Sequence, residues 1–287
     1  MIRPADIIAA SPFCFGGFHP LVAYSHFARA GIRYVEVPAL PASLAMRHEL
    51  TTFVPEVLGG DGVRALRERL SHLGLTPITV AAFCDLLEPG QVEALRCRID
   101  FAQQLGAAYL INDATARPEF GEHRRQLLNT LRHLADYAEE RGVRIALEIH
   151  EGPTRNGRLA AEFLDAVDHP NVGVNYDTGN VYYYNEGIDP SEDVHHIAPR
   201  VVHVHLKDTT GGKGDWQFCT LGKGRVQFSS IIDTLQAAGF PGPYSLEVEG
   251  VQGEDLNREG YMHRLQESLH YLQQIGLLAA DLPNNAH

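Results

Sequence analysis

The sequence has few features that would place the protein in a membrane, in an oxidising compartment or on a nucleic acid. No apolar run in its 287 residues approaches the ~20 residues that a membrane-spanning helix needs, and the first residues do not resemble an export signal. The four cysteines form no CxxC pair, so we expect reduced thiols in a cytoplasmic protein. A net charge of -12 speaks against binding to a phosphate backbone.

A glycine-rich dinucleotide loop is also missing. Residues 11–17 read SPFCFGG rather than GxGxxG, which disfavours a doubly wound open sheet. Strand-like and helix-like segments instead alternate along the whole chain, and glycines end several of the helices. The expected strands are 6–11, 32–37, 76–82, 107–111, 144–150, 171–177, 201–208 and 244–249. This pattern predicts an α/β fold with a single (β/α)8 TIM barrel over residues 1–276.

Two segments do not fit the regular alternation. Residues 38–60 contain three prolines and a Gly-Gly pair, and we expect an irregular stretch or lid over the mouth of the barrel, followed by a helix that Asp61 caps. Residues 190–198 are expected to form a helix. Residues 277–287 are expected to form a loose C-terminal tail.

The seventh expected strand, VVHVHLKD at 201–208, carries the strongest functional signal. Alternate residues of a strand point to opposite faces, so one face is apolar and the other carries two imidazoles and an ammonium. The apolar face holds Val202, Val204 and Leu206, and the polar face holds His203, His205 and Lys207. Inside a parallel barrel the polar face would open at the C-terminal mouth, where such barrels carry their chemistry.

Four expected strands bring groups that can bind a metal to this mouth: Glu148, Asp177, His205 and Glu247. The first three lie about one strand–helix unit apart, so we expect them at one height in the barrel. Three carboxylates in a dry pocket would repel one another without a cation. Three oxygen ligands and one nitrogen suit one divalent ion, with Mn²⁺, Mg²⁺ or Co²⁺ favoured and Zn²⁺ possible.

Further inward-facing residues lie above and below these four. His203 lies one step deeper and is expected to support a ligand by hydrogen bonding. His150 and Glu249 lie one step nearer the mouth, where they contact substrate or sit at the solvated rim. Glu36, on the second strand, faces inward as a functional group or as part of a buried ion pair.

The segment from Lys207 to Arg225 combines four cationic residues with five glycines. Backbone N–H groups of such a loop can bind an anion, so the segment either holds a phosphate or carboxylate of the substrate or is a flexible solvated loop. Trp216, the single tryptophan, covers a substrate or packs beneath it.

Five segments together resemble the sugar phosphate isomerase/epimerase group, the xylose isomerase-like TIM barrels. They read LEIH at 147–150, NYDTGN at 175–180, VHVHLKD at 202–208, LGKG at 221–224 and SLEVE at 245–249. The resemblance implies that Glu148, Asp177, His205 and Glu247 hold one divalent metal ion. In the ketose epimerases of this group the two glutamates also move protons, which makes Glu148 and Glu247 the catalytic acid/base pair. The resemblance further suggests a homo-oligomer.

The sequence departs from the epimerase pattern at two places. Asn180 stands where those enzymes often have a histidine, and no arginine follows His205. Relatives with His-x-Lys-Asp include enzymes that dehydrate or isomerise inositol-derived ketones. We therefore expect a metal-dependent isomerase or epimerase in carbohydrate metabolism, acting on a sugar, sugar acid or polyol ketone through a metal-bound enediolate. The substrate-contacting or supporting residues would be His150, Asn180, His203, Lys207, Trp216 and Glu249.

Three alternatives remain open. A lyase could dehydrate a 2-keto-polyol, such as an inosose, on the same site. A DNA-repair endonuclease of the same barrel superfamily would need three metals, more histidines and a basic face, which the charge disfavours. A non-catalytic barrel that binds a sugar would bind metal without turnover.

Overall fold

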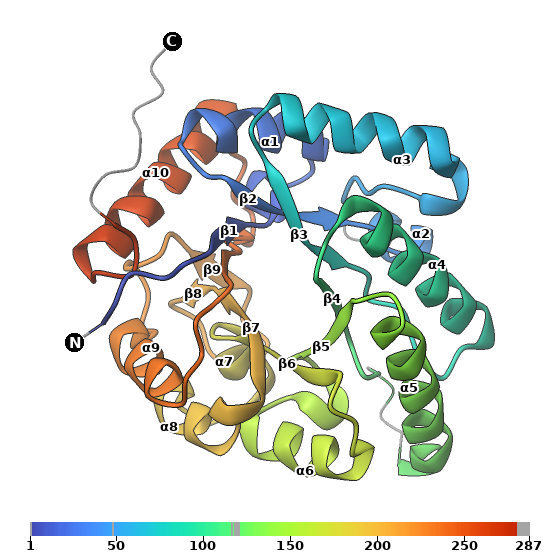
Figure 1. The fold of residues 1–287 in the computed structure, drawn as a ribbon. Helices are drawn as coiled ribbons and strands as arrows, with labels where there is room; N and C mark the ends of the chain where they lie inside the picture. Colours follow the sequence, from blue (N-terminus) through green and yellow to red (C-terminus); the bar gives the residue numbers. More distant parts are fainter. Residues whose placement is uncertain (1, 48, 116, 118–120, 280–287) are drawn as a thin grey trace.

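Eight parallel strands close into one barrel, and helices surround it (Figure 1). The computed structural model describes residues 2–47, 49–115, 117 and 121–279. Around the barrel the strands follow the order β1, β10, β7, β6, β5, β4, β3, β2. Their bounds are β1 Ile8–Ala10, β2 Tyr34–Pro38, β3 Thr76–Ala81, β4 Tyr109–Asn112, β5 Arg144–Glu148, β6 Val172–Asp177, β7 Val201–Leu206 and β10 Tyr244–Leu246. The predicted (β/α)8 barrel is confirmed.

The longer helices pack their apolar faces on the outside of the barrel, whereas the short helices α2 and α7 lie at its mouth and line the cavity there. The helices are α1 Pro20–Arg29, α2 Ala42–Arg47, α3 Pro55–His72, α4 Pro89–Leu105, α5 Arg124–Glu139, α6 Gly157–Val167, α7 Asn180–Tyr184, α8 Pro190–Asp193, α9 Phe228–Ala237 and α10 Arg258–Gln274. In α5 the residues Leu127, Leu131 and Leu134 recur at helical spacing and are buried. No helix in the described ranges is long and apolar enough to cross a bilayer.

The prediction of an irregular stretch at residues 38–60 is wrong in part. It contains α2, and α3 begins at Pro55 instead of Asp61. Proline suits the first turn of a helix because the N–H that it lacks would be unpaired there. Gly59 interrupts the helical geometry of α3 with φ 58° and ψ -179°. The first turn is therefore out of phase with the rest of the helix, and the periodicity of the sequence does not reveal it. Likewise, the helix predicted at 190–198 is α8 followed by two 3-10 turns.

The predicted tail begins inside the packed structure. Leu277 is fully buried, and its carbonyl accepts a hydrogen bond from the N–H of Ala5 at 2.9 Å. This bond ties the end of the last helix to the start of the chain. The remainder of the predicted tail, residues 280–287, lies outside the described residues.

The predicted alternation in β7 is wrong at Val202. The pairing of β6 with β7 shifts register, because Val174 faces Val201 whereas Asn175 faces His203. This bulge turns Val202 inward, where it packs with Ile111 and Ala146 from β4 and β5. From His203 onward the alternation holds, and it brings His205 to the inner face.

The segment between β7 and α9, together with the residues that follow β10, folds over the barrel mouth as a small antiparallel sheet. Its strands are β8 Asp208–Thr209, β9 Gln217–Cys219 and β11 Gly250–Val251. The Asp208 carboxylate is buried and accepts hydrogen bonds from the N–H groups of Gly222 and Gly224 at 2.8 and 2.9 Å. Hydrogen bonds therefore hold the glycine-rich segment from Lys207 to Arg225 in place, and it is not the flexible solvated loop that the sequence left as an alternative. Because the Asp208 carboxylate accepts from these two N–H groups, they are not available to bind an anion of the substrate.

The bulge depends on a glycine opposite Val202. A Cβ on Gly173 would lie 2.4 Å from Cγ1 of Val202 and 2.9 Å from the carbonyl oxygen of Arg200. We expect Gly173→Ala to lower the free energy of unfolding by about 1–3 kcal/mol in urea titrations, as overpacking of a core does. Gly90→Ala is the control, because a Cβ there meets nothing within 4 Å and α4 gains a better helix former. Equal stability of Gly173→Ala and wild type would contradict this account.

Candidate active site

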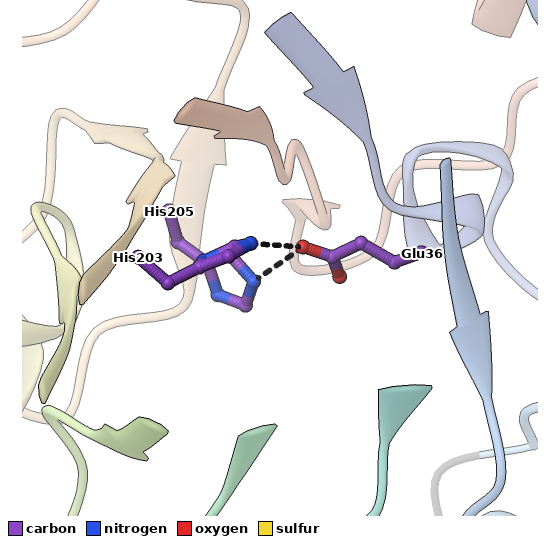
Figure 2. A group of neighbouring side chains, drawn as sticks. All are labelled: Glu36, His203 and His205. Carbon is purple, nitrogen blue, oxygen red and sulfur yellow. Dashed lines mark hydrogen bonds and ion pairs between the residues drawn. The ribbon is translucent and has the colours of Figure 1, made fainter. Parts of the chain in front are cut away.

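The two nitrogens of the His205 ring face opposite groups of acids at the C-terminal end of the barrel. Nε2 lies 3.1 Å from Oε1 of Glu36, which reaches across from β2 (Figure 2). Nδ1 lies 2.9 Å from Oε1 of Glu148, 3.2 Å from Oε2 of Glu247 and 3.6 Å from Oδ2 of Asp177. All five side chains are buried.

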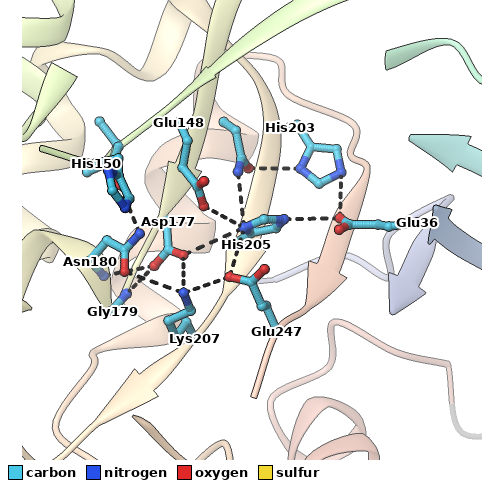
Figure 3. Close-up of polar contacts among 12 residues, drawn as sticks. Glu36, Glu148, His150, Asp177, Gly179, Asn180, His203, His205, Lys207 and Glu247 are labelled. Atoms are coloured by element: carbon cyan, nitrogen blue, oxygen red, sulfur yellow. Dashed lines mark hydrogen bonds and ion pairs between the residues drawn. The ribbon is translucent and has the colours of Figure 1, made fainter. Parts of the chain in front are cut away.

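The four residues predicted to bind a metal do meet at one point (Figure 3). One donor atom from each lies within 4.8 Å of the others, and the four come from the ends of β5, β6 and β7 and from just past β10. The set offers three carboxylate oxygens and one imidazole nitrogen. Such a set fits a divalent ion, since it would bring two positive charges to three negative groups that water cannot screen.

Lys207 places a second cation among the same carboxylates. Its Nζ lies 2.9 Å from Oδ2 of Asp177, 2.6 Å from Oε2 of Glu247 and 2.8 Å from Oε2 of Glu249. A Cβ on Gly179 would lie 2.7 Å from Cγ of Lys207, so only glycine leaves room for this buried chain. The sequence predicted Lys207 at the site but not its contact with three carboxylates.

These charges shift the pKa of the groups that carry them. Burial raises the pKa of Asp177, but Lys207 and His205 outweigh it and hold that pKa well below the usual value. Burial raises the pKa of Glu148 well above its usual value, although His205 opposes the shift. Burial and the nearby Glu247, opposed by Lys207, raise the pKa of Glu249 to about 7.

His203 lies beneath the ligand cluster, as the sequence predicted. Its Nδ1 lies 2.8 Å from Oδ1 of Asn175, and the amide of Asn175 also reaches Nδ1 of His205 at 3.1 Å. Burial lowers the pKa of His203 to about 3, so its ring is neutral. His203 does not line the cavity above the cluster and contacts the site only through its neighbours.

A cavity of about 930 Å³ opens above the buried cluster around His205, and Glu148 and Glu247 of that cluster form part of its lining. Of the predicted substrate-contacting residues, it is lined by His150, Asn180, Lys207, Trp216 and Glu249. Residues of α2 and of the segment before it also line the cavity, so part of the stretch predicted as a lid borders the site.

Two polar side chains in the wall of this cavity, Asn180 and His150, contact neighbouring polar groups. The Asn180 side chain donates to the carbonyl of Ile149 at 3.0 Å, which fixes its amide. His150 lies 2.5 Å from the hydroxyl of Tyr184 and 3.5 Å from Asp113.

Several residues of the site escaped the sequence interpretation. Asn175 stands two residues before Asp177, so strand alternation places it inward and could have revealed it. Asp113 follows β4, whose end the sequence placed one residue early. Tyr184 sits in the short helix α7 and carried no periodic signal. Glu36 was recognised as inward-facing, but its contact with His205 joins β2 to β7 and leaves no trace in local sequence.

Comparison with known proteins identifies the family. The family model described as "xylose isomerase-like TIM barrel" matches residues 25–274. The chain belongs to this family. It is 23% identical over 203 residues to an uncharacterized protein of Methanocaldococcus jannaschii, with 67% of this chain and 68% of that protein covered. It is 27% identical over 178 residues to L-ribulose-5-phosphate 3-epimerase UlaE of Escherichia coli, and this match covers 60% of each protein.

Solved structures of similar fold include a sugar epimerase and two proteins with bound metal. The D-allulose 3-epimerase of Methylomonas sp. superposes with a TM-score of 0.74 at 21% identity, covering 96% of this chain and all of that one. A protein of the same family from Mycobacterium smegmatis, in complex with magnesium, gives 0.72 at 19%, covering 94% and 96%. The IOLI protein with a zinc atom gives 0.72 at 19%, covering 94% and 98%. At these identities the likeness establishes the fold.

The contacts of Lys207 generate a prediction about stability. Removing its ammonium leaves Asp177, Glu247 and Glu249 without the cation that they share, and removing one partner of a buried ion pair costs about 3–5 kcal/mol. We therefore expect Lys207→Met to lower the free energy of unfolding by about 3 kcal/mol in urea titrations with EDTA present.

The control for this prediction is Lys223→Met. The Lys223 side chain is 62% exposed and lies 3.6 Å from Glu267, so we expect its loss to change stability by less than about 0.5 kcal/mol. If Lys207→Met were as stable as Lys223→Met, the ammonium would not be holding the carboxylates together.

Proposed function

We propose that the protein is a divalent-metal-dependent isomerase or epimerase of a sugar, sugar acid or related polyol ketone. The observation that supports this most directly is the meeting of Glu148 and Glu247 beside Nδ1 of His205, where both glutamates line a cavity that has room for a sugar or its phosphate ester. The family membership and the similarity to sugar epimerases support the same class of reaction.

In this proposal Glu148, Asp177, His205 and Glu247 hold one ion, with Mn²⁺, Mg²⁺ or Co²⁺ favoured and Zn²⁺ possible. A bound ion would polarise a substrate carbonyl and its neighbouring hydroxyl, so that the C–H between them becomes acidic. Burial lowers the pKa of His205, but the surrounding carboxylates outweigh it and raise that pKa well above its usual value while no ion is bound, so the ion and a proton would compete for Nδ1.

The two glutamates supply the proton transfers. They come from β5 and from the end of β10, strands that are separated around the barrel by β6 and β7, so they approach a substrate from different sides. One carboxylate removes the carbon-bound proton, and the other delivers a proton to the opposite face of that carbon or to its neighbour. Lys207 contacts Glu247 and fixes the orientation of that carboxylate during both steps.

The cavity wall offers hydrogen-bonding groups to a polyol. His150, Asn180 and Glu249 present an imidazole, an amide and a carboxyl group, and Trp216 offers an aromatic face. Such groups pair with sugar hydroxyls and with the apolar face of a sugar ring. We assign these four residues to substrate binding, and we expect a homo-oligomer as the resemblance suggested.

A second candidate is a lyase that dehydrates a 2-keto-polyol on the same site. This reaction needs an acid that protonates the departing hydroxyl. Glu249 suits that role because its pKa is raised to about 7 and it lines the cavity beside Lys207. The release of water and the loss of a hydroxyl from the product distinguish this reaction from epimerisation.

Turnover with added metal tests the proposed function. The purified protein is treated with EDTA, reloaded with Mn²⁺, Co²⁺ or Mg²⁺, and offered ketoses, their phosphate esters and inosose-like ketones. We expect activity that depends on the ion, and a fall in kcat of about 10²–10⁴-fold in Glu148→Gln and Glu247→Gln at saturating metal, as the loss of an acid–base group causes. Glu162→Gln is the control, since Glu162 is exposed and pairs only with Arg158 among the described contacts. Turnover that persists in EDTA, or in both glutamine variants, would contradict the proposal.

A further inference from the structure

Glu36 stands on the far side of the His205 ring from the proposed metal ligands. Its Oε1 lies 3.1 Å from Nε2 of His205 and 3.4 Å from Nε2 of His203, and all three side chains have no solvent exposure (Figure 2). The carboxylate comes from β2, whereas both histidines come from β7 (Figure 2). This contact therefore spans the interior of the barrel.

An imidazole that binds an ion through Nδ1 must carry its proton on Nε2. Glu36 is placed to accept that proton in a hydrogen bond, because its oxygen lies within hydrogen-bonding distance of Nε2. A carboxylate in this position fixes the tautomer and the orientation of the ring and makes the other nitrogen more basic.

The Glu36 carboxylate has the two histidines and the Ser245 side chain as its polar neighbours. Its second oxygen, Oε2, is buried and has no hydrogen-bond partner among the described residues. The Tyr24 hydroxyl donates to the backbone carbonyl of Glu36 at 2.8 Å, which anchors the strand and does not involve the carboxylate. Burying a carboxylate is costly unless polar groups pair with it, and both imidazoles contact Oε1 of Glu36 here.

We propose that Glu36 is a positioning residue that holds His205 with its proton on Nε2 and its Nδ1 aimed at the divalent ion. This inference rests on the metal site of the proposed function, and it assigns a role to a residue outside the four ligands. His203 lies against the same oxygen, and its link through Asn175 to His205 keeps the two rings in place.

The test measures binding of Mn²⁺ to metal-free protein by calorimetry, with a chelator of known affinity as competitor. We expect one ion per chain for wild type, and one ion bound about 10–100-fold more weakly by Glu36→Gln, the loss typical of such outer carboxylates. The control is Asp193→Asn. Asp193 is also a buried carboxylate, but it accepts from Gly157 and Tyr176 outside the cluster, so its loss should lower stability and leave the affinity for Mn²⁺ unchanged.

A second measurement observes the proton on His205 directly. In wild type loaded with diamagnetic Zn²⁺, ¹H–¹⁵N spectra should show His205 protonated at Nε2, with the proton shifted far downfield by its bond to a carboxylate. In Glu36→Gln that resonance should move upfield, a change that a merely structural role of Glu36 would not produce.

Four results would overturn the inference, and they are distinguishable. Wild-type affinity in Glu36→Gln, or a proton on Nδ1 of His205 in the loaded protein, would remove Glu36 from this role while the metal site stands. Two ions in wild type and one in Glu36→Gln would make Glu36 a metal ligand, together with His203 and His205. No ion in wild type would overturn the proposed function itself.

Discussion

The structure depends on the crowding of buried carboxylates around two cationic side chains at one end of the barrel. Glu36, Glu148, Asp177 and Glu247 are almost fully buried, and His205 and Lys207 are the basic groups among them. Like charges at these separations in a dry interior are unstable unless cations balance them. The arrangement is a poor way to build a stable core, but its donor atoms fit the divalent ion that we propose.

The barrel makes this crowding possible. Parallel strands end at one face, so residues far apart in the chain reach a common point. Small residues let the site close: Gly173 admits the bulged Val202 beneath it, and Gly179 lets Lys207 pass beside α7. In the small sheet, β8 and β9 follow β7 and β11 follows β10, and the Asp208 carboxylate accepts hydrogen bonds from the glycine-rich loop after β9.

The meeting of the four proposed metal ligands could be predicted from the sequence, because it follows from the alternation of side chains along a strand and from the topology of the barrel. Strand alternation placed Glu148, Asp177 and His205 inward, and the repeat of strand and helix placed them at one height. Glu247 was found by the same rule, although it lies just past the end of β10.

The sequence-based predictions failed where the chain departs from regular strand alternation or helical periodicity, or where a contact spans the barrel. A single-residue bulge turned Val202 inward against its predicted face. Gly59 disguised the first turn of α3 within a stretch that looked irregular. The partners of Glu36 and Asp208 were not predicted, because a hydrogen bond between distant segments leaves no local pattern.

The central claim is that two glutamates on different sides of a substrate exchange a carbon-bound proton with solvent. The most direct measurement is a single turnover in D₂O with the metal-loaded protein and a ketose that it converts, followed by NMR of the product. The account predicts one deuterium at the carbon that changes configuration, because the proton removed by one glutamate is not the proton that the other returns. A product that keeps its original hydrogen at that carbon would contradict the account.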